Sequence, residues 1–273
     1  MQPLLSNIQE QKAAEAFNKQ SAVFDAIYSP NLTIQYKRKR VRTHVEKYLP
    51  PGSNILELNA GTGEDAIYFA YKAHTVHATD IAADMQQQLR KKVNDAGLTN
   101  NISTEICSFN HLSTLKNKGT YDLIFSNFAG LNCTSELDKV VQSFSPLLKH
   151  GGVTTLVVMP NFCWWETLLA LRGNFKLAFR RFNSKNGVKA NVEGVSFMCW
   201  YYSPNYIIKA LKDEFELLSV EGLCTIVPPS YFENFPIRFP KLFKWLQKAE
   251  GKLKRVWPWK TTGDYFIISL RKK

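Results

Sequence analysis

The sequence predicts an α/β protein built on a seven-stranded, mostly parallel sheet with helices on both faces. From residue 54 onwards, short apolar segments alternate with segments of helical periodicity at least four times. Glycines also stand where helices give way to strands, at Gly97, Gly119 and the pair Gly151-Gly152. Because parallel neighbours need a crossover connection, this alternation indicates a sheet wound on both faces.

Residues 51–160 carry the repeated strand–helix pattern of the predicted core. Strands are expected at 55–58, 75–79, 102–106, 121–126 and 153–159. Helices are expected at 64–73, 83–96 and 136–148.

After Pro160 the pattern changes to an aromatic and basic segment of helical character. Residues 161–202 are therefore expected to form an α-rich cap inserted after the fifth strand. Residues 203–273 then complete the sheet, with a helix at 204–215, a strand near 216–227 and a last strand at 264–270.

Composition is that of an ordinary globular protein: 45% of the 273 residues are hydrophobic and 21% are charged. A chain of this length can bury a substantial core without a metal or disulfide bond, and we expect no metal site. The five cysteines show no CxxC spacing, which indicates free thiols. No apolar run approaches the ~20 residues of a membrane span, and the N-terminus lacks the features of a secretory signal. A cytoplasmic location is expected.

Positive charge is concentrated in the C-terminal part of the chain. Residues 1–160 hold 16 Lys and Arg against 14 Asp and Glu, whereas residues 161–273 hold 19 against 9. In Phe239–Trp257, apolar residues recur at helical spacing among lysines and arginines. Such a helix either lies on an anionic membrane surface or packs on the sheet with a solvated basic face. The second arrangement is the commoner one.

A glycine turn, Gly61-Thr-Gly63-Glu-Asp-Ala66, follows the first strand. Its GxGxxA pattern alone fits a dinucleotide fold that receives a pyrophosphate at a helix N-terminus. Glu64 and Asp65 would repel an anion there. Glu57, inside the apolar strand, requires hydrogen-bond donors or a cation.

Asp80 ends the second strand, where a carboxylate can accept both hydroxyls of a ribose. The turn is therefore predicted to hold a cationic nucleoside without phosphate. S-adenosylmethionine has these properties.

The segment Glu57-Leu-Asn59-Ala-Gly61-Thr-Gly63 resembles the first motif, acidic–x–Gly–x–Gly–x–Gly, of the class I S-adenosylmethionine-dependent methyltransferases. Asn59 replaces the first glycine, and asparagine is one of the few residues that tolerate a left-handed backbone. The resemblance covers about residues 17–160 and is to the small-molecule group, which includes quinone- and biotin-pathway methyltransferases. It implies a Rossmann-like fold, S-adenosyl-L-methionine as cofactor and S-adenosyl-L-homocysteine as product.

The same resemblance implies the cofactor contacts. They are Glu57, Asn59, Ala60, Gly61 and Gly63 in the turn; Asp80, Ile81 and Met85 around the ribose and adenosine; Ser108 and Phe109 at the adenine; and Ser126, Asn127 and Phe128 beneath the methyl donor. Ser108 stands where the family usually has an acidic residue that contacts the adenine amino group. Residues 1–50 would form lid helices, with Tyr28 at the methionine end of the cofactor.

The expected reaction is methyl transfer to a small, partly apolar or aromatic molecule by in-line attack on the sulfonium methyl. Cap residues form either an aromatic substrate pocket or the cap's own core. These residues are Trp164, Trp165, Arg172, Trp200 and Tyr201. His111, Tyr201 and Tyr202 are the candidates for a general base, if the acceptor needs one.

Two other functions remain open. The basic C-terminal part suggests an RNA methyltransferase, but Ser126-Asn127-Phe128-Ala129 lacks the Pro-Pro-aromatic tetrapeptide of enzymes that methylate base amines, which argues against a nucleic-acid partner. A catalytically degenerate protein that binds a lipid surface or a partner is the other alternative. The basic C-terminal helix would make the peripheral membrane contact.

Overall fold

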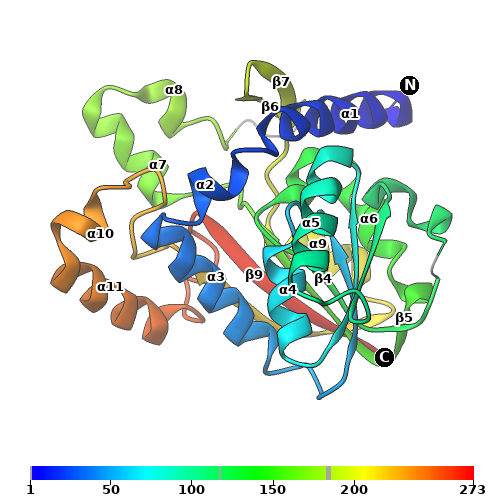
Figure 1. Cartoon of the computed structure of the whole chain (residues 1–273). Coiled ribbons are helices and arrows are strands. Elements are labelled where there is room, and N and C mark those ends of the chain that lie inside the picture. The colour runs from blue at the N-terminus through cyan, green and yellow to red at the C-terminus, as the bar shows by residue number, and fades with distance from the viewer. Residues whose placement is uncertain (1, 117, 183–185) are drawn as a thin grey trace.

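A seven-stranded sheet forms the centre of the protein, as predicted (Figure 1). The computed structural model describes residues 2–116, 118–182 and 186–273. The strand order is β3-β2-β1-β4-β5-β9-β8. The strands are β1 (Asn54–Leu58), β2 (Thr75–Asp80), β3 (Ile102–Ile106), β4 (Tyr121–Ser126), β5 (Leu148–Val158), β8 (Phe215–Leu223) and β9 (Tyr265–Lys272).

The sheet is parallel except for β9, the strand next to the β8 edge. Strands β3, β2, β1, β4 and β5 run in one direction, and β9 is antiparallel to both of its neighbours. The chain order reverses at β1, whose Glu57 is in register with Ala78 of β2 and Phe125 of β4. A crevice is expected outside the carboxyl ends of the strands at such a point.

Helices cover both faces of the sheet. On one face, α3 (Leu32–Val45), α4 (Glu64–Tyr71) and α5 (Ala83–Asp95) pack an apolar cluster against alternate strand residues such as Phe125. On the other, α6 (Leu137–Gln142) and α9 (Pro204–Leu211) pack against residues such as Ile124. Neighbouring residues of β4 thus serve opposite faces, as the two-residue period of a strand requires.

The helix expected at 136–148 is shorter in the structure. It ends at Gln142 and is followed by a 3₁₀ turn, Ser145–Leu147. Pro146 has no backbone N–H and cannot continue an α-helix. Strand β5 therefore begins at Leu148, before the glycine pair.

The cap is part helix and part hairpin, although an α-rich insertion is expected from the sequence. It comprises α7 (Trp164–Leu168), a 3₁₀ turn (Leu169–Arg172), α8 (Phe175–Ala178), β6 (Val188–Val192) and β7 (Val195–Cys199). Glu193 and Gly194 between the strands both have positive φ, 49° and 78°. That is the conformation of a two-residue type I′ turn, which matches the twist of a hairpin. The hairpin packs on the N-terminal helix α1 (Gln2–Gln20), where the rings of Phe17 and Phe197 lie 6.1 Å apart.

A buried ionic cluster ties the cap to the sheet. Arg181, 1% exposed, contacts Glu166 of α7 and Oδ1 of Asp264, the latter at 3.1 Å. Lys37 of α3 contacts Oδ2 of Asp264 at 2.7 Å. Cys163, Glu166 and Asp264 bring potential metal ligands within 4.8 Å of one another. Because protein cations already occupy both carboxylates, this group is an ion-pair cluster.

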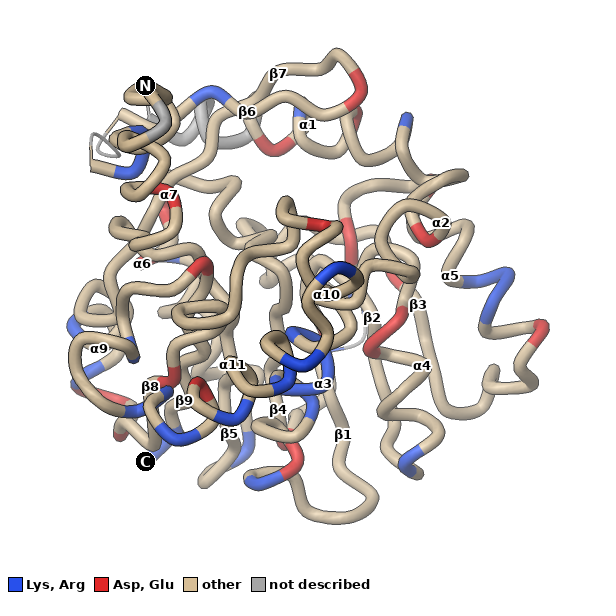
Figure 2. The backbone as a smooth tube through the Cα atoms, turned by 90° about the vertical axis from the view of Figure 1, so that its left-hand side faces the viewer, with Lys and Arg blue, Asp and Glu red and all other residues tan. Residues whose placement is uncertain are grey.

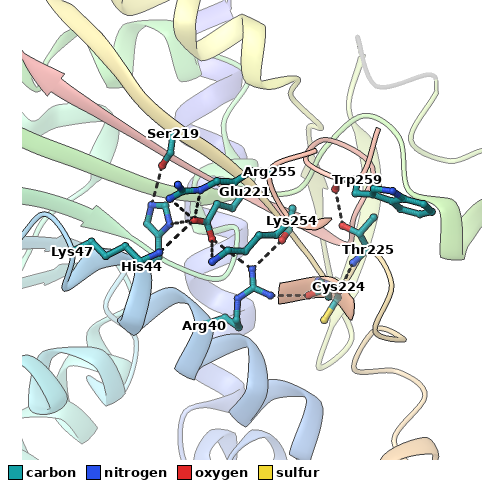
Figure 3. Close-up of polar contacts among 12 residues, drawn as sticks. Arg40, His44, Lys47, Ser219, Glu221, Cys224, Thr225, Lys254, Arg255 and Trp259 are labelled. Carbon is teal, nitrogen blue, oxygen red and sulfur yellow. Dashed lines mark hydrogen bonds and ion pairs between the residues drawn. The ribbon is translucent and has the colours of Figure 1, made fainter. Parts of the chain in front are cut away.

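Two buried glutamates anchor the C-terminal helices α10 (Phe235–Arg238) and α11 (Pro240–Leu253). Glu250 of α11 accepts the backbone N–H groups of residues 224–227 and the hydroxyl of Tyr36. Glu221 of β8 forms ion pairs with Lys254 and Arg255, which follow α11. Its carboxylate also contacts His44 of α3 (Figure 3). None of the described helices is both long and apolar enough to cross a membrane. The cytoplasmic location stays a prediction.

Candidate functional site

A pocket opens at the carboxyl ends of β1, β2 and β4, the position that the strand order predicts. Ten of the residues assigned to the cofactor from the sequence line it. They are Glu57, Asn59, Ala60, Gly61, Asp80, Ile81, Met85, Phe109, Asn127 and Phe128. The assignments as cofactor contacts remain predictions, but the tertiary fold brings these residues to one place.

The glycine turn forms the floor of the pocket. Asn59, Gly61 and Gly63 all have positive φ, 46°, 56° and 79°. A Cβ on Gly63 would lie 1.9 Å from Cδ1 of Leu89, so this position requires glycine. Asn59 adopts the left-handed backbone, and its amide joins the turn to the loop after β4. Its Nδ2 donates to the carbonyl of Asn127 at 2.9 Å, and its Oδ1 accepts from Ser126 at 2.6 Å.

Asp80 is fixed by backbone donors. Its Oδ2 accepts the N–H of Gly61 at 2.9 Å, and its Oδ1 accepts the N–H of Ala82 at 2.8 Å. Burial raises the pKa of Asp80, although these N–H groups oppose the shift. Each carboxylate oxygen can accept a further hydrogen bond. The arrangement presents a preorganised acceptor to the pocket.

Glu57 has an unsatisfied oxygen at the pocket wall. The residue is 3% exposed, and its Oε2 has no hydrogen-bond partner within the described part of the chain. Burial, and then the negative charge of Asp65, raise the pKa of Glu57 well above its usual range. A buried carboxyl oxygen without a partner is unfavourable. A cationic or hydrogen-bond-donating group in the pocket would satisfy it.

Glu64 and Asp65 are both neutralised by basic residues. Asp65 accepts from Arg42 Nε at 2.7 Å, from Arg38 at 2.8 Å and from the side chain of Asn127 at 2.8 Å. Burial alone would raise the pKa of Asp65, but the two arginines outweigh it and hold the pKa below its usual value. Glu64 pairs with Lys92 at 2.6 Å. The repulsion of an anion expected from these two carboxylates is therefore weakened, and Glu57 and Asp80 carry the electrostatic argument.

Helix α1 roofs the pocket and contributes Glu10, which the sequence did not reveal as a site residue. Glu10 is 2% exposed and lines the pocket with Ala13, Ala14 and Phe17. Its carboxylate accepts from the hydroxyl of Ser108 at 2.7 Å and from the side chain of Asn110 at 2.8 Å. Nothing local marks Glu10, because its partners lie about 100 positions away in sequence.

The short helix α2 (Phe24–Tyr28) is fastened to the glycine turn. Asp25 accepts from the hydroxyl of Thr62 at 2.6 Å and pairs with Lys92 at 2.9 Å. Phe24 lines the pocket. Tyr28, expected at the methionine end, instead lines an adjoining hollow, and its hydroxyl donates to Gln20 at 3.3 Å.

Three other predicted cofactor residues support the pocket without lining it. Gly63 leaves room for the side chain of Leu89. The hydroxyl of Ser126 donates to Asn59, and the hydroxyl of Ser108 donates to Glu10. Phe128, in the loop after β4, has φ of 50° and lies under the guanidinium of Arg38. A positive φ at a phenylalanine is strained and is typical of functional loops.

The predicted substrate residues of the cap lie elsewhere. Trp164 packs on Phe162, with ring centroids 5.0 Å apart, and Trp165 packs on Phe232 at 5.8 Å. The ring of Tyr201 lies 5.1 Å from the guanidinium carbon of Arg181.

Trp200 packs against the apolar core, and the side chain of Arg172 lies outside the described part of the structure. This arrangement corresponds to the alternative interpretation, in which the aromatic residues form the cap's own core. The helical half of the cap contacts the 226–234 loop through Trp165 and Phe232, and the Arg181 cluster ties it to the residue before β9.

The candidate bases also lie outside the pocket lining. His111 is exposed in the 3₁₀ turn η1 (Phe109–Thr114). The hydroxyl of buried Tyr202 donates to the carbonyl of Thr134, and burial raises the pKa of both Tyr201 and Tyr202.

Comparison with known proteins agrees with the fold and the glycine turn. Residues 55–152 match a family described as methyltransferase domain. No curated protein matches the chain. Solved structures share the fold at low identity. A putative S-adenosylmethionine-dependent methyltransferase from Listeria monocytogenes is 17% identical, with a TM-score of 0.59 over 88% of this chain and 99% of that one.

Two further neighbours are named for specific acceptors. A putative sarcosine dimethylglycine methyltransferase from Galdieria sulphuraria is 16% identical, with a TM-score of 0.57 over 88% of this chain and 86% of that chain. A geranyl diphosphate C-methyltransferase from Streptomyces coelicolor A3(2), in complex with Mg²⁺, geranyl diphosphate and S-adenosyl-L-homocysteine, is 13% identical, with a TM-score of 0.55 over 87% and 79%. The chain therefore contains a methyltransferase domain at residues 55–152, on a fold that it shares with these solved structures.

Proposed function

We propose that the chain transfers a methyl group from S-adenosyl-L-methionine to a small, partly apolar acceptor. The observation that carries the proposal is a pair of carboxylates, buried Glu57 and half-buried Asp80, on the wall of one pocket. One oxygen of Glu57 has no hydrogen-bond partner among the described residues, and Asp80 is held by backbone donors. A cationic nucleoside matches both, whereas a diphosphate would meet negative charge.

The strand order gives the orientation of the nucleoside. The residues that follow β3, β2, β1 and β4 lie in that order across the pocket. Phe109 and Met85 would enclose the adenine, Asp80 would accept the ribose hydroxyls, and Glu57 would face the ammonium of the methionine part. Arg38, which lines the pocket, would face its carboxylate.

Glu10 is the proposed acceptor for the adenine amino group. Ser108 donates its hydroxyl to Glu10 and does not line the pocket. The carboxylate that the family usually places at the end of the third strand would here come from the lid helix. Adenosine binding would then be coupled to the position of α1.

Beyond the proposed methionine end, the wall is apolar. It is made by Phe17, Phe24, Phe128 and Cys133. The described lining contains no histidine, lysine or tyrosine to act as a base. We therefore propose an acceptor that is already nucleophilic, such as an amine, a thiol or an acidic carbon or phenol.

In this mechanism the chain aligns the reactants and excludes water. S-adenosyl-L-methionine supplies a methyl group on a cationic sulfur that is a good leaving group. Asp80 and Glu57 hold the nucleoside in place, and Phe24 and Phe128 restrict the approach of the acceptor.

Titration calorimetry with S-adenosyl-L-methionine and S-adenosyl-L-homocysteine tests the proposal. Saturable binding of both compounds is expected. Formation of S-adenosyl-L-homocysteine can then be followed over amine, thiol and phenol acceptors. Absence of binding to either nucleoside would favour the degenerate, non-catalytic alternative.

A further inference from the structure

The helix α11 has two opposite stripes of different character. Phe243, Leu246, Glu250 and Leu253 are buried or half-buried, at spacings of three and four residues. Lys241, Trp245, Lys248 and Lys252 occupy the opposite side at spacings of four and three. Trp245 is 63% exposed and stands among the lysines.

The lysine stripe lies in a segment that contains a single acidic residue. Between Phe235 and Trp257 the single carboxylate is Glu250, which is buried and bonded to backbone N–H groups. Lys254 and Arg255 turn inward onto Glu221 (Figure 3). The four exposed lysines of α11, at 241, 244, 248 and 252, make no ion pair within the described structure.

Large apolar side chains protrude from the same side of the molecule. On α10 and α11, Ile237 is 70% exposed and Leu242 44%, while Trp257 just beyond them is 77% exposed. The helical half of the cap adds six more: Trp164, Leu168, Leu171, Phe175, Phe179 and Phe182. Leu171 is 84% exposed.

The cap and the C-terminal helices form one face. Both lie on the left of Figure 1, and Figure 2 looks onto this side, with Lys and Arg positions along α11. The contact between Trp165 of α7 and Phe232 before α10 joins them. So many exposed apolar residues on one side exceed the scattered single residues of an ordinary surface.

We propose that this face, defined by the helical half of the cap and α10–α11, docks on the surface of an anionic lipid membrane. Lysines around an exposed tryptophan suit the headgroup region, and protruding leucine, isoleucine and phenylalanine side chains suit the acyl boundary. The net positive charge of residues 161–273 complements anionic lipid.

Other partners fit this chemistry less well. Aliphatic tips such as Leu171 and Ile237 provide no stacking platform for nucleic-acid bases. Lysine is depleted in protein–protein interfaces, but it is abundant here. The inference does not depend on methyl transfer, since none of these residues lines the pocket.

Vesicle sedimentation of the full chain tests the proposal. Binding is expected to vesicles of phosphatidylcholine mixed equally with phosphatidylglycerol, and not to phosphatidylcholine alone. Added sodium chloride should weaken it. Replacing Lys241, Lys244, Lys248 and Lys252 by Gln should reduce the partition coefficient at least about a hundredfold. The matched control replaces four exposed lysines outside the cap and α10–α11 by Gln: Lys91 of α5, Lys116 after η1, Lys209 of α9 and Lys212. It should bind as the wild type does.

A second pair of variants tests the apolar contribution. Leu171→Ser with Trp245→Ser should weaken vesicle binding about tenfold or more. The control variant Tyr71→Ser with Ile106→Ser removes exposed apolar residues at the ends of α4 and β3, and it should bind as the wild type does. The proposal would be overturned if the chain bound neutral and anionic vesicles equally, or if the control variants lost as much binding as the test variants. Binding to duplex RNA in the absence of vesicle binding would also overturn it.

Discussion

At the scale of single residues, the pocket depends on carboxylates placed in different environments. Asp80 accepts backbone N–H groups and Asp65 pairs with two arginines, whereas one oxygen of Glu57 has no partner in the part of the chain that the structure describes. Their pKa values accordingly move in different directions. Environment, more than residue type, determines which carboxylate remains available to a ligand.

Asp80→Asn should weaken binding of S-adenosyl-L-homocysteine about a hundredfold, because two charge-assisted hydrogen bonds are lost. Calorimetry at neutral pH measures the change. Asp84→Asn, one turn away and exposed, is the matched control and should bind normally. Equal affinity in the two variants would remove Asp80 from the ribose site.

Glu57 should make S-adenosyl-L-methionine binding depend on pH. Its pKa is raised in the free protein, and a bound ammonium favours the ionised form. Affinity should therefore rise with pH, by up to about tenfold per unit, and level off above the raised pKa. Calorimetry across a pH series shows the slope.

Glu57→Gln provides the control for this pH dependence. The variant should bind more weakly, and its affinity should vary less with pH. A wild-type profile as flat as that of Glu57→Gln would contradict the assignment of the ammonium to Glu57.

At the scale of elements, α1 is both a roof and a source of chemistry. It packs on the hairpin β6-β7 through Phe17, and it sends Glu10 to Ser108 at the end of β3. Helix α11 is similarly two-sided, with Glu250 anchored inside and Trp245 outside. In both helices, the role of a side chain follows from whether it contacts the pocket, the protein interior or solvent.

Glu10→Gln should reduce affinity for S-adenosyl-L-homocysteine about tenfold, because a charged acceptor at the adenine becomes neutral. The shape of the side chain is retained. Glu15→Gln on the exposed side of the same helix should leave the affinity unchanged. An inosine analogue, which lacks the amino group, should bind the two variants equally; a preserved tenfold difference would point to a structural role for Glu10.

At the scale of the whole molecule, buried ion pairs join parts that are distant in sequence. Arg181 and Lys37 meet at Asp264, which links the cap, α3 and the region before β9. Glu221 and Glu250 attach α11 to the sheet and to α3. These contacts hold the helical half of the cap beside the sheet.

Asp264→Asn should lower the free energy of unfolding by roughly 3–5 kcal/mol at neutral pH, since buried Lys37 loses its carboxylate partner and Arg181 loses one of its two. Urea unfolding measures the change. Glu216→Gln, in an exposed pair with Arg271, should cost less than about 1 kcal/mol. Similar losses in the two variants would show that the buried cluster is unimportant.

The same cluster should make the wild type sensitive to acid. Burial opposes ionisation of Asp264, but Lys37 and Arg181 hold its folded pKa below the ordinary value of 3.8. Its stabilisation is therefore present above pH 3.8 and is lost as pH falls through the folded pKa. Asp264→Asn should show a flatter stability profile over that range.

The sequence by itself determined the sheet and the turn. The alternation of apolar strand segments with helical segments located all seven sheet strands. The glycines with Glu57 and Asp80 located the pocket, because these signals are local in the chain. The tertiary structure decided what covers the pocket. Glu10, Arg38 and the direction of the cap depend on contacts between residues far apart in sequence, and the two-sided character of α11 depends on which stripe meets the sheet. No short sequence pattern specifies these long-range contacts.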